Sequence, residues 1–296
     1  MNQTITLTLT AEQQDRLYAL FKETETKAPA YARWQIRPEN CVITCYASGK
    51  VVFQGKDANV YASAFDDAVL NSRQTPKKTA SPASVDLREP MAGSDEVGTG
   101  DYFGPVTVCA CIVTPQDMPL LEKLGVRDSK ALTDTLIRKA APELMEKLTH
   151  SLLIVQPPRY NAVHERMNLN AIKAMLHNQA YLNLAKKREL PKLRVIDQFA
   201  PKSTYYRYLE GVQDVVTGIT FETKAEDKYP AVGAASVIAR YGFLKVMDQY
   251  EEHYGMKLQK GSTSAATRCA REFAAKFGKE ELGKVAKLHF KVTDKI

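Results

Sequence analysis

The chain has 296 residues, of which 44% are hydrophobic and 25% are charged, and its formal net charge is +7. This composition is normal for a globular protein with one large domain or two smaller ones. No run approaches the roughly 18 uninterrupted apolar residues of a membrane span, and the N-terminus lacks the basic start and apolar core of a signal peptide. Five cysteines, an odd number, do not suggest a disulfide framework. We therefore expect buried, reduced thiols and a cytoplasmic protein without membrane association.

Residues 1–70 form a first block with the predicted order β-α-β-β-β-α. Hydrophobic residues alternate with threonines in its first strand, and Thr10 and Gln13 match the capping box of a helix. The buried stripe expected for this helix is Leu17, Leu20 and Phe21. Strands are predicted at 31–36, 41–46 and 51–53, followed by a helix over 57–69. The order predicts a small α+β module with one sheet.

Basic and aromatic residues are interleaved in residues 31–56 of this block. The basic residues are Arg33, Arg37, Lys50 and Lys56, and the aromatic residues among them are Tyr31, Trp34 and Tyr46. Such residues on an open sheet can contact nucleic acid, but they can equally be ordinary face and edge residues. A second basic region lies at the other end of the chain, where residues 257–296 carry ten Lys and Arg against four Asp and Glu. Its charge suits a polyanion, although a solvated basic helix explains it equally well.

Residues 71–89 are polar and proline-bearing, which is typical of a flexible linker. A larger α/β domain is predicted from residue 90 to residue 296. Its strands are expected at 91–97, 106–113, 151–156, 193–197 and 217–222. Its helices are expected at 133–148, 170–188, 231–250, 264–277 and 280–287. Three opening strands followed by helix–strand units favour a mixed sheet.

Acidic residues fall where strands of this domain end. Asp95 and Glu96 stand at the end of the first strand in a glycine-rich exit, and Asp197 ends a later apolar strand. Glu226 and Asp227 precede a helix rich in small residues that can lie close to the sheet. Acids in a partly dry site require a cation, and about four carboxylates fit two Mg²⁺ or Mn²⁺ ions about 4 Å apart for phosphoryl chemistry. Taken singly, each acid could instead cap a turn or a helix.

The motifs together resemble the type 2 ribonucleases H, and in particular the bacterial ribonuclease HIII branch. The resemblance spans roughly residues 90–290, and its longest motif is Gly93-Ser-Asp-Glu-Val-Gly-Thr-Gly-Asp-Tyr-Phe-Gly-Pro105. Further motifs follow in the expected order: Asp128-Ser-Lys130, Met167-Asn-Leu-Asn170 with Lys173-Ala174, Val195-Ile-Asp197, and Lys224-Ala-Glu226 leading into 234–240. The first block has the element order of the TATA-binding-protein-like module that precedes the catalytic domain in this branch.

The resemblance implies a ribonuclease H-like catalytic domain that cuts the RNA strand of RNA/DNA hybrids and leaves 5′-phosphate and 3′-hydroxyl ends. It carries the catalytic and metal-binding carboxylates over to Asp95, Glu96, Asp197 and Glu226, with Glu226 preferred to Asp227. The implied cofactor is Mg²⁺ or Mn²⁺, two ions during catalysis. The implied partner is a hybrid duplex bound by a monomer.

The same resemblance implies substrate contacts at Gly98, Thr99, Gly100, Ser129, Lys130, Asn168 and Lys173. Glycines at 98 and 100 let backbone groups approach 2′-hydroxyls, which separate RNA from DNA. Thr99 stands where the related ribonuclease HII branch has arginine, and the tyrosine of that branch is absent around 260–263. These departures predict a preference for runs of ribonucleotides over a single embedded one. The five histidines show no metal-ligand spacing, so surface or core roles are expected for them.

Two other functions fit part of the pattern. A DNA-cutting or DNA-joining enzyme of the same structural superfamily, such as a transposase or Holliday-junction resolvase, would share the acid-lined mixed sheet. A non-catalytic nucleic-acid-binding protein would use the first block and the basic C-terminal region. The glycine-rich motif favours the ribonuclease.

Overall fold

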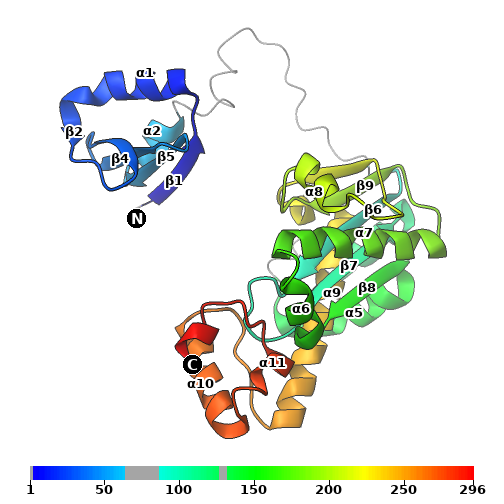
Figure 1. The fold of residues 1–296 in the computed structure, drawn as a ribbon. Helices are drawn as coiled ribbons and strands as arrows, with labels where there is room; N and C mark the ends of the chain where they lie inside the picture. The colour runs from blue at the N-terminus through cyan, green and yellow to red at the C-terminus, as the bar shows by residue number, and fades with distance from the viewer. Residues whose placement is uncertain (1–2, 64–86, 127–131) are drawn as a thin grey trace. The chain divides into compact units, whose positions relative to one another are not determined.

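The structure, a computed structural model, describes residues 3–63, 87–126 and 132–296. The chain divides into two compact units, Met1–Ser84 and Val85–Ile296, each with a five-stranded sheet of its own (Figure 1). Most of the predicted linker, and the second half of the helix predicted over 57–69, lie outside the described residues. The linker therefore stays a prediction.

The first unit packs helices against an antiparallel sheet. The strands lie in the order β1-β5-β4-β3-β2, with the bounds β1 (Gln3–Thr8), β2 (Glu25–Thr26), β3 (Ala32–Ile36), β4 (Cys41–Tyr46) and β5 (Lys50–Gly55). Helix α1 (Ala11–Phe21) begins at the predicted capping box, since Thr10 N donates to Gln13 Oε1 at 2.8 Å and Gln13 N donates to Thr10 Oγ1 at 3.3 Å. A short helix, α2 (Ala58–Ser63), follows the last strand. The predicted order is confirmed, with the two-residue β2 added.

The buried side of α1 differs from the prediction at Leu20, whose side chain is 61% exposed. The residues turned inward are Gln14, Leu17 and Phe21, which are spaced three and four apart and so share one face of the helix. Gln14 is buried because its Nε2 donates to Leu9 O at 2.7 Å, which satisfies the amide. Leu20 lies on the other side of Leu17 from these residues, and the sheet does not cover it.

Trp34 belongs to the core of this unit and not to a basic–aromatic surface. Its side chain is 7% exposed, and its ring lies 5.5 Å from that of Tyr18 on α1. Tyr31, by contrast, is 92% exposed. Nucleic-acid contact by this unit stays a prediction, with one aromatic residue fewer to support it.

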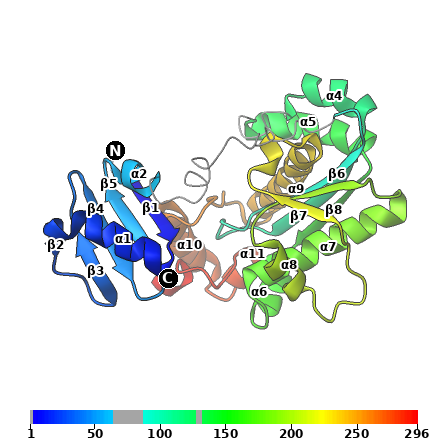
Figure 2. The same cartoon turned by 90° about the horizontal axis from the view of Figure 1, so that it is seen from above.

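The second unit is built on the predicted mixed sheet (Figure 2). Its strand order is β10-β9-β6-β7-β8, with the bounds β6 (Met91–Val97), β7 (Val106–Val113), β8 (His150–Val155), β9 (Leu193–Asp197) and β10 (Ile219–Glu222). The hairpin strands β6, β7 and β8 are antiparallel neighbours, whereas β9 and β10 run parallel to β6. The carboxyl ends of β6, β9 and β10 therefore meet at one edge of the sheet.

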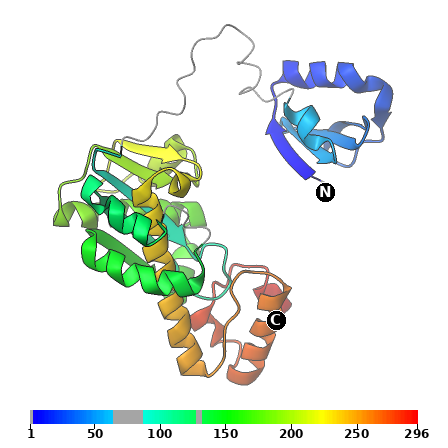
Figure 3. The ribbon, with the colours of Figure 1, turned by 180° about the vertical axis from the view of Figure 1, so that it is seen from behind.

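Helices cover both faces of this sheet. One face carries α7 (Leu169–Lys187), with α6 (Pro157–His164) and α8 (Lys202–Tyr208) beside it; the other carries α9 (Pro230–Tyr254) and α5 (Asp134–Lys147). Seen from behind, α9 extends past the sheet toward α10 (Ser264–Phe277) and α11 (Leu282–Val285) (Figure 3). The sequence prediction omitted α6, α8 and the short α4 (Met118–Lys123).

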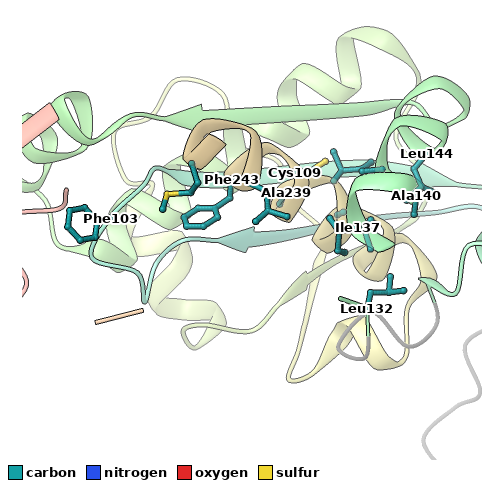
Figure 4. Close-up of a cluster of buried hydrophobic side chains, with 14 of the residues drawn as sticks. Phe103, Cys109, Leu132, Ile137, Ala140, Leu144, Ala239 and Phe243 are labelled. Atoms are coloured by element: carbon teal, nitrogen blue, oxygen red, sulfur yellow. The ribbon is translucent and has the colours of Figure 1, made fainter. Parts of the chain in front are cut away.

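Alternate residues of the central strands enter two different cores, as the period of a strand requires. Met91, Cys109 and Cys111 pack with α5 and α9, in the cluster of which Figure 4 shows a part. Ala92, Val108 and Ala110 pack on the opposite face with α7. The helix α9 lies unusually close to β6, because a Cβ at Gly93 would meet Val232 N at 2.4 Å. Small side chains on both elements permit this approach.

The predicted state of the cysteines is confirmed, since all five are buried free thiols. One residue of the basic C-terminal region is not solvated: Lys287 is fully buried, and its Nζ donates to Gly104 O at 2.5 Å. Within the described ranges, no helix has the length and apolar character needed to cross a membrane.

Candidate active site

The strand ends bring Asp95 and Asp197 next to each other. Ser94 on β6 pairs with Ile196 on the parallel strand β9, so the following position on each strand is the acid. Adjacent strands lie about 4.8 Å apart, and side chains at matching positions of parallel strands point to the same face. For this pair that face is the one covered by α9.

Burial raises the pKa of Asp95 to about 8, and the negative charges of Glu96 and Asp197 contribute to the rise. A hydrogen bond with Ser236 on α9 and one from Glu96 N, at 2.8 Å from Asp95 Oδ1, act in the opposite direction. A carboxyl group in this position holds its negative charge poorly unless a cation is near. Asp95 thus has the character expected of a metal ligand in a crowded acidic site.

Glu226 reaches the same place through a turn that follows β10. Lys224 adopts a left-handed conformation with φ of 55°, which redirects the chain into the 3-10 turn Ala225–Asp227. Ala225 N then donates to Asp197 Oδ1 at 2.9 Å. Burial raises the pKa of Asp197, and the charges of Glu226 and Glu96, with a hydrogen bond between the Asp197 and Glu226 side chains, add to the rise. Asp227, in contrast, is exposed.

Glu96 points to the other face of the sheet, because neighbouring residues of a strand alternate. Its Oε1 accepts from Lys173 Nζ at 2.6 Å, and its Oε2 accepts from His177 Nε2 at 2.8 Å. Burial on its own would raise the pKa of Glu96, but the hydrogen bonds and charges of His177 and Lys173 outweigh burial and lower it. Two adjacent acids therefore have opposite pKa shifts.

His177 is a site residue that the sequence prediction missed. It is fully buried, and its Nδ1 lies 2.7 Å from Ser94 Oγ. The available signal was its spacing of four residues from Lys173, which places both side chains on one face of α7. An examination of each histidine by itself does not reveal that His177 pairs with Glu96.

The glycine-rich segment after β6 is held by the C-terminal part of the chain. Gly98 has a φ of +92°, and a Cβ there would meet Pro105 O at 2.1 Å, so only glycine fits. Gly261 N donates to Asp101 Oδ1 at 2.5 Å, and Gly104 N donates to Val285 O at 2.8 Å. Gly100 is exposed, and a Cβ there would meet nothing within 4 Å. The segment is therefore anchored at its ends and open at Gly100.

The other predicted substrate contacts have different settings. Ser129 and Lys130 lie outside the described residues. Asn168 is exposed and caps α7, since its Oδ1 accepts from Ala171 N at 2.9 Å. Lys173 turns its ammonium inward to Glu96, and its side chain is 9% exposed. Thr99, between its glycines, is partly exposed. The substrate roles of all these residues stay predictions.

The donor chemistry of the site fits a hard divalent cation. The carboxylate oxygens of Asp95, Glu96, Asp197 and Glu226 are ligands that Mg²⁺ and Mn²⁺ prefer. Burial, and after it the charges of neighbouring acids, raise the pKa of Asp95 and of Asp197. In the part of the chain that the structure describes, however, no three His, Cys, Asp or Glu side chains converge closely enough to hold a metal ion. Glu96 faces α7, whereas Asp197 bonds with Ala225 and Glu226. The fit of these residues to a divalent cation thus rests on the type of ligand that they offer and on the electrostatic interaction among their carboxylates.

Comparisons with known proteins bear on both units. A family model described as ribonuclease HII matches residues 92–293, and one described as a domain of unknown function (DUF3378) matches residues 4–79. The chain is 39% identical over 300 residues to a ribonuclease HIII of Exiguobacterium sibiricum, which covers 99% of this chain and 96% of that protein. It is 40% identical over 275 residues to a ribonuclease HIII of Bacillus subtilis, which covers 90% and 88%.

A solved structure is also similar to this chain over nearly its whole length. The crystal structure of Bst-RNase HIII in complex with Mn²⁺ matches with a TM-score of 0.70 and 33% sequence identity, and the match covers 99% of this chain and 97% of that one. The similarity therefore extends over both units of the chain.

Proposed function

This chain belongs to the ribonuclease HIII family of metal-dependent endoribonucleases that act on RNA/DNA hybrids, and we propose that it hydrolyses the RNA strand of such hybrids. The proposed catalytic residues are Asp95, Glu96, Asp197 and Glu226. The products would carry 5′-phosphate and 3′-hydroxyl ends. The observation that carries the site assignment is the convergence of β6, β9 and the turn after β10, which brings acids from distant parts of the chain into electrostatic contact.

We propose that the four carboxylates hold two divalent ions, Mg²⁺ or Mn²⁺. Such ions supply an activated water and stabilise the leaving oxygen. Asp95 and Asp197 stand at matching positions of adjacent strands, which favours a shared ligand role for them. Glu226 lies beside Asp197 and is fixed by the bond between Ala225 N and Asp197 Oδ1. Glu96 extends the acidic set toward α7.

We propose that the segment Gly98–Gly100 contacts the ribose of the substrate. This segment begins two residues after Glu96, and at Gly100 the backbone is open to a ligand. Backbone groups that approach 2′-hydroxyls distinguish RNA from DNA at the strand that is cut. Thr99 and the absence of tyrosine in 260–263 support a preference for runs of ribonucleotides. We further propose that the enzyme acts as a monomer and that it is cytoplasmic. Buried free thiols are typical of proteins in a reducing compartment, which supports the second of these proposals.

The decisive experiment compares Asp95→Asn with the wild type on a labelled RNA/DNA hybrid in Mg²⁺ or Mn²⁺. Cleavage should fall by at least about 100-fold, because loss of a metal ligand exceeds the 10–100-fold effects of residues that merely support ligands. Hybrid binding, measured by fluorescence anisotropy, should persist. Retained cleavage would remove Asp95 from the site.

Substrate choice requires a separate experiment. Three duplexes of one sequence are compared: a full RNA/DNA hybrid, a DNA duplex with one ribonucleotide, and plain DNA. The full hybrid should be cut with the highest kcat/KM, and plain DNA should stay intact. Cutting of plain DNA would favour a DNA-processing enzyme of the same superfamily, and equal cutting of the first two would contradict the proposed preference.

A further inference from the structure

The Glu96 carboxylate is enclosed by two side chains of α7. Lys173 Nζ lies 2.6 Å from Glu96 Oε1 and His177 Nε2 lies 2.8 Å from Oε2, so each oxygen has its own donor. The three side chains are 11% (Glu96), 9% (Lys173) and 0% (His177) exposed. Donors at both oxygens fix the rotation of the carboxylate as well as its position.

Two further residues hold these donors in place. Phe199, two residues beyond Asp197, lies under both of them: Lys173 Nζ is 4.1 Å from the centroid of its ring, and the His177 ring stacks on it at 5.4 Å and 25°. Ser94, on the same face of β6 as Glu96, holds His177 Nδ1 at 2.7 Å. Since Nε2 must carry the proton that it donates to Glu96, Ser94 fixes the orientation of the ring from its other side.

This arrangement affects any cation bound at Glu96. Each carboxylate oxygen keeps a lone pair that a cation can use, so the two donors do not exclude Glu96 as a ligand. The Lys173 charge, however, lies at hydrogen-bond distance from that ligand and is little screened, because the side chain is buried. A divalent cation at Glu96 is therefore repelled by the Lys173 ammonium, and the cation and the ammonium share the single negative charge of the Glu96 carboxylate.

We propose that Lys173 and His177 are positioning residues for Glu96, and that Lys173 also competes with divalent cations for this carboxylate and so weakens their binding. The inference rests on the proposed function, in which Glu96 is a metal ligand. It also gives Lys173 a role different from the substrate contact that the sequence resemblance implied. Its ammonium already has Glu96 and the Phe199 ring as partners.

Mn²⁺ affinity of the full-length chain without nucleic acid tests the competition. In isothermal titration calorimetry, Lys173→Met should bind Mn²⁺ about tenfold tighter than the wild type, because a buried unit charge beside the cation is removed. Lys173→Arg, which keeps the charge, should stay near the wild-type affinity. The control is Lys186→Met on the exposed last turn of the same helix, which removes an equal charge far from Glu96 and should leave the affinity unchanged.

His177 is tested as a positioning residue through kinetics. At saturating Mn²⁺, His177→Leu should lower kcat on the hybrid by about 10–100-fold with little change in KM. His177→Gln, which can present an amide N–H near the position of Nε2, should recover a large part of the loss. A variant that merely loosened the fold would not show rescue by glutamine.

Thermal melting monitored by circular dichroism checks that each variant is folded. If Lys173→Met is unfolded, Lys173→Gln replaces it with the same expected direction. Mn²⁺ affinity of a folded Lys173 variant that is unchanged or weaker would overturn the competition, and so would an equal gain in Lys186→Met. A raised KM for the hybrid with unchanged Mn²⁺ affinity would return Lys173 to substrate contact. Absence of rescue at His177 would overturn its positioning role.

Asp95→Asn in the same titration distinguishes a failure of the proposed metal site from a failure of the proposed competition by Lys173. Mn²⁺ binding by Asp95→Asn equal to that of the wild type would refute the proposed metal site itself. Lost binding in Asp95→Asn together with unchanged affinity in Lys173→Met would refute only the competition.

Discussion

Two neighbouring acids, Asp95 and Glu96, show how one residue step separates two chemical environments. Asp95 lies on the face of α9 among other acids, and its pKa is raised to about 8 by burial and by those charges. Glu96 lies on the face of α7, where burial alone would raise its pKa, but its interactions with His177 and Lys173 outweigh burial and lower it. The sequence indicates both acids, and it indicates that their side chains point to opposite faces of the sheet, because the alternation of side chains along a strand is a local property. It does not indicate Lys173 or His177 as the partners, because these residues are 77 and 81 positions away.

A test at residue scale distinguishes Glu226 from Asp227. Glu226 is partly buried and interacts with Asp197, whereas Asp227 is exposed. Glu226→Gln should therefore lower kcat on the hybrid by about 100-fold or more, and Asp227→Asn should change it by less than about threefold. Steady-state cleavage of the two purified variants measures both effects. The reverse ranking would move the fourth carboxylate to Asp227.

Lys287 gives a pH-dependent test at the same scale. Burial lowers its pKa to about 7 in the folded chain, while an unfolded lysine titrates near its ordinary value of 10.5. Between these values the unfolded chain binds more protons, so the free energy of unfolding rises with pH across this window. Relative to Lys287→Met, the wild type should gain stability from pH 7 to pH 10. Melting temperatures at both pH values measure the gain, and parallel shifts in the two proteins would contradict it.

At the scale of elements, the sheet of the second unit was predictable and three helices were not. β6 and β7 are found at the predicted residues. The signal for β7 is its long, mainly apolar run after Pro105, and the signal for β6 is its position just before the glycine-rich exit. Helices α6 and α8 were missed for a shared reason: Pro157 begins α6 and Pro201 precedes α8, and each proline reads as a chain breaker. Proline is also accepted in the first turn of a helix, where no N–H partner is lost.

The glycine-rich segment allows a matched pair of variants at this scale. Gly98→Ala should lower the melting temperature by about 4 °C or more and reduce cleavage, because φ is +92° and the added Cβ would meet Pro105 O. Gly100→Ala should leave the melting temperature unchanged, since a Cβ there would meet nothing within 4 Å. If Gly100 lies against the ribose of the substrate, this second variant will raise the KM for the hybrid. An unchanged KM would place the contact elsewhere.

At the scale of the whole molecule, the two units have separate cores and different sheets. The order of elements in the first unit followed from local patterns such as the capping box at Thr10. The side of α1 that is buried did not, because Gln14 replaces Leu20 in the core through a bond to Leu9 O. A buried amide is recognised only when its partner is known.

Removal of residues 1–84 tests whether the first unit contributes to hybrid binding and the second unit to catalysis. The remaining unit has its own core and all four proposed catalytic carboxylates, so it should fold and keep a measurable kcat. Its KM for the hybrid should rise by about tenfold or more, because a second binding module adds effective concentration. Cleavage kinetics of the truncated and full-length chains measure both constants. An unchanged KM would show that the first unit does not contribute to hybrid binding.

The contact between β6 and α7 has a consequence for protein engineering. A chimera that took α7 from a parent without lysine and histidine at positions 173 and 177 would leave Glu96 buried without its ion-pair partner Lys173 and without the hydrogen bond to His177. Breaking a buried ion pair from one side costs about 3–5 kcal/mol, a large share of the stability of a domain. Recombination libraries within this family should therefore keep this strand and this helix from the same parent, with crossover points placed outside residues 94–177.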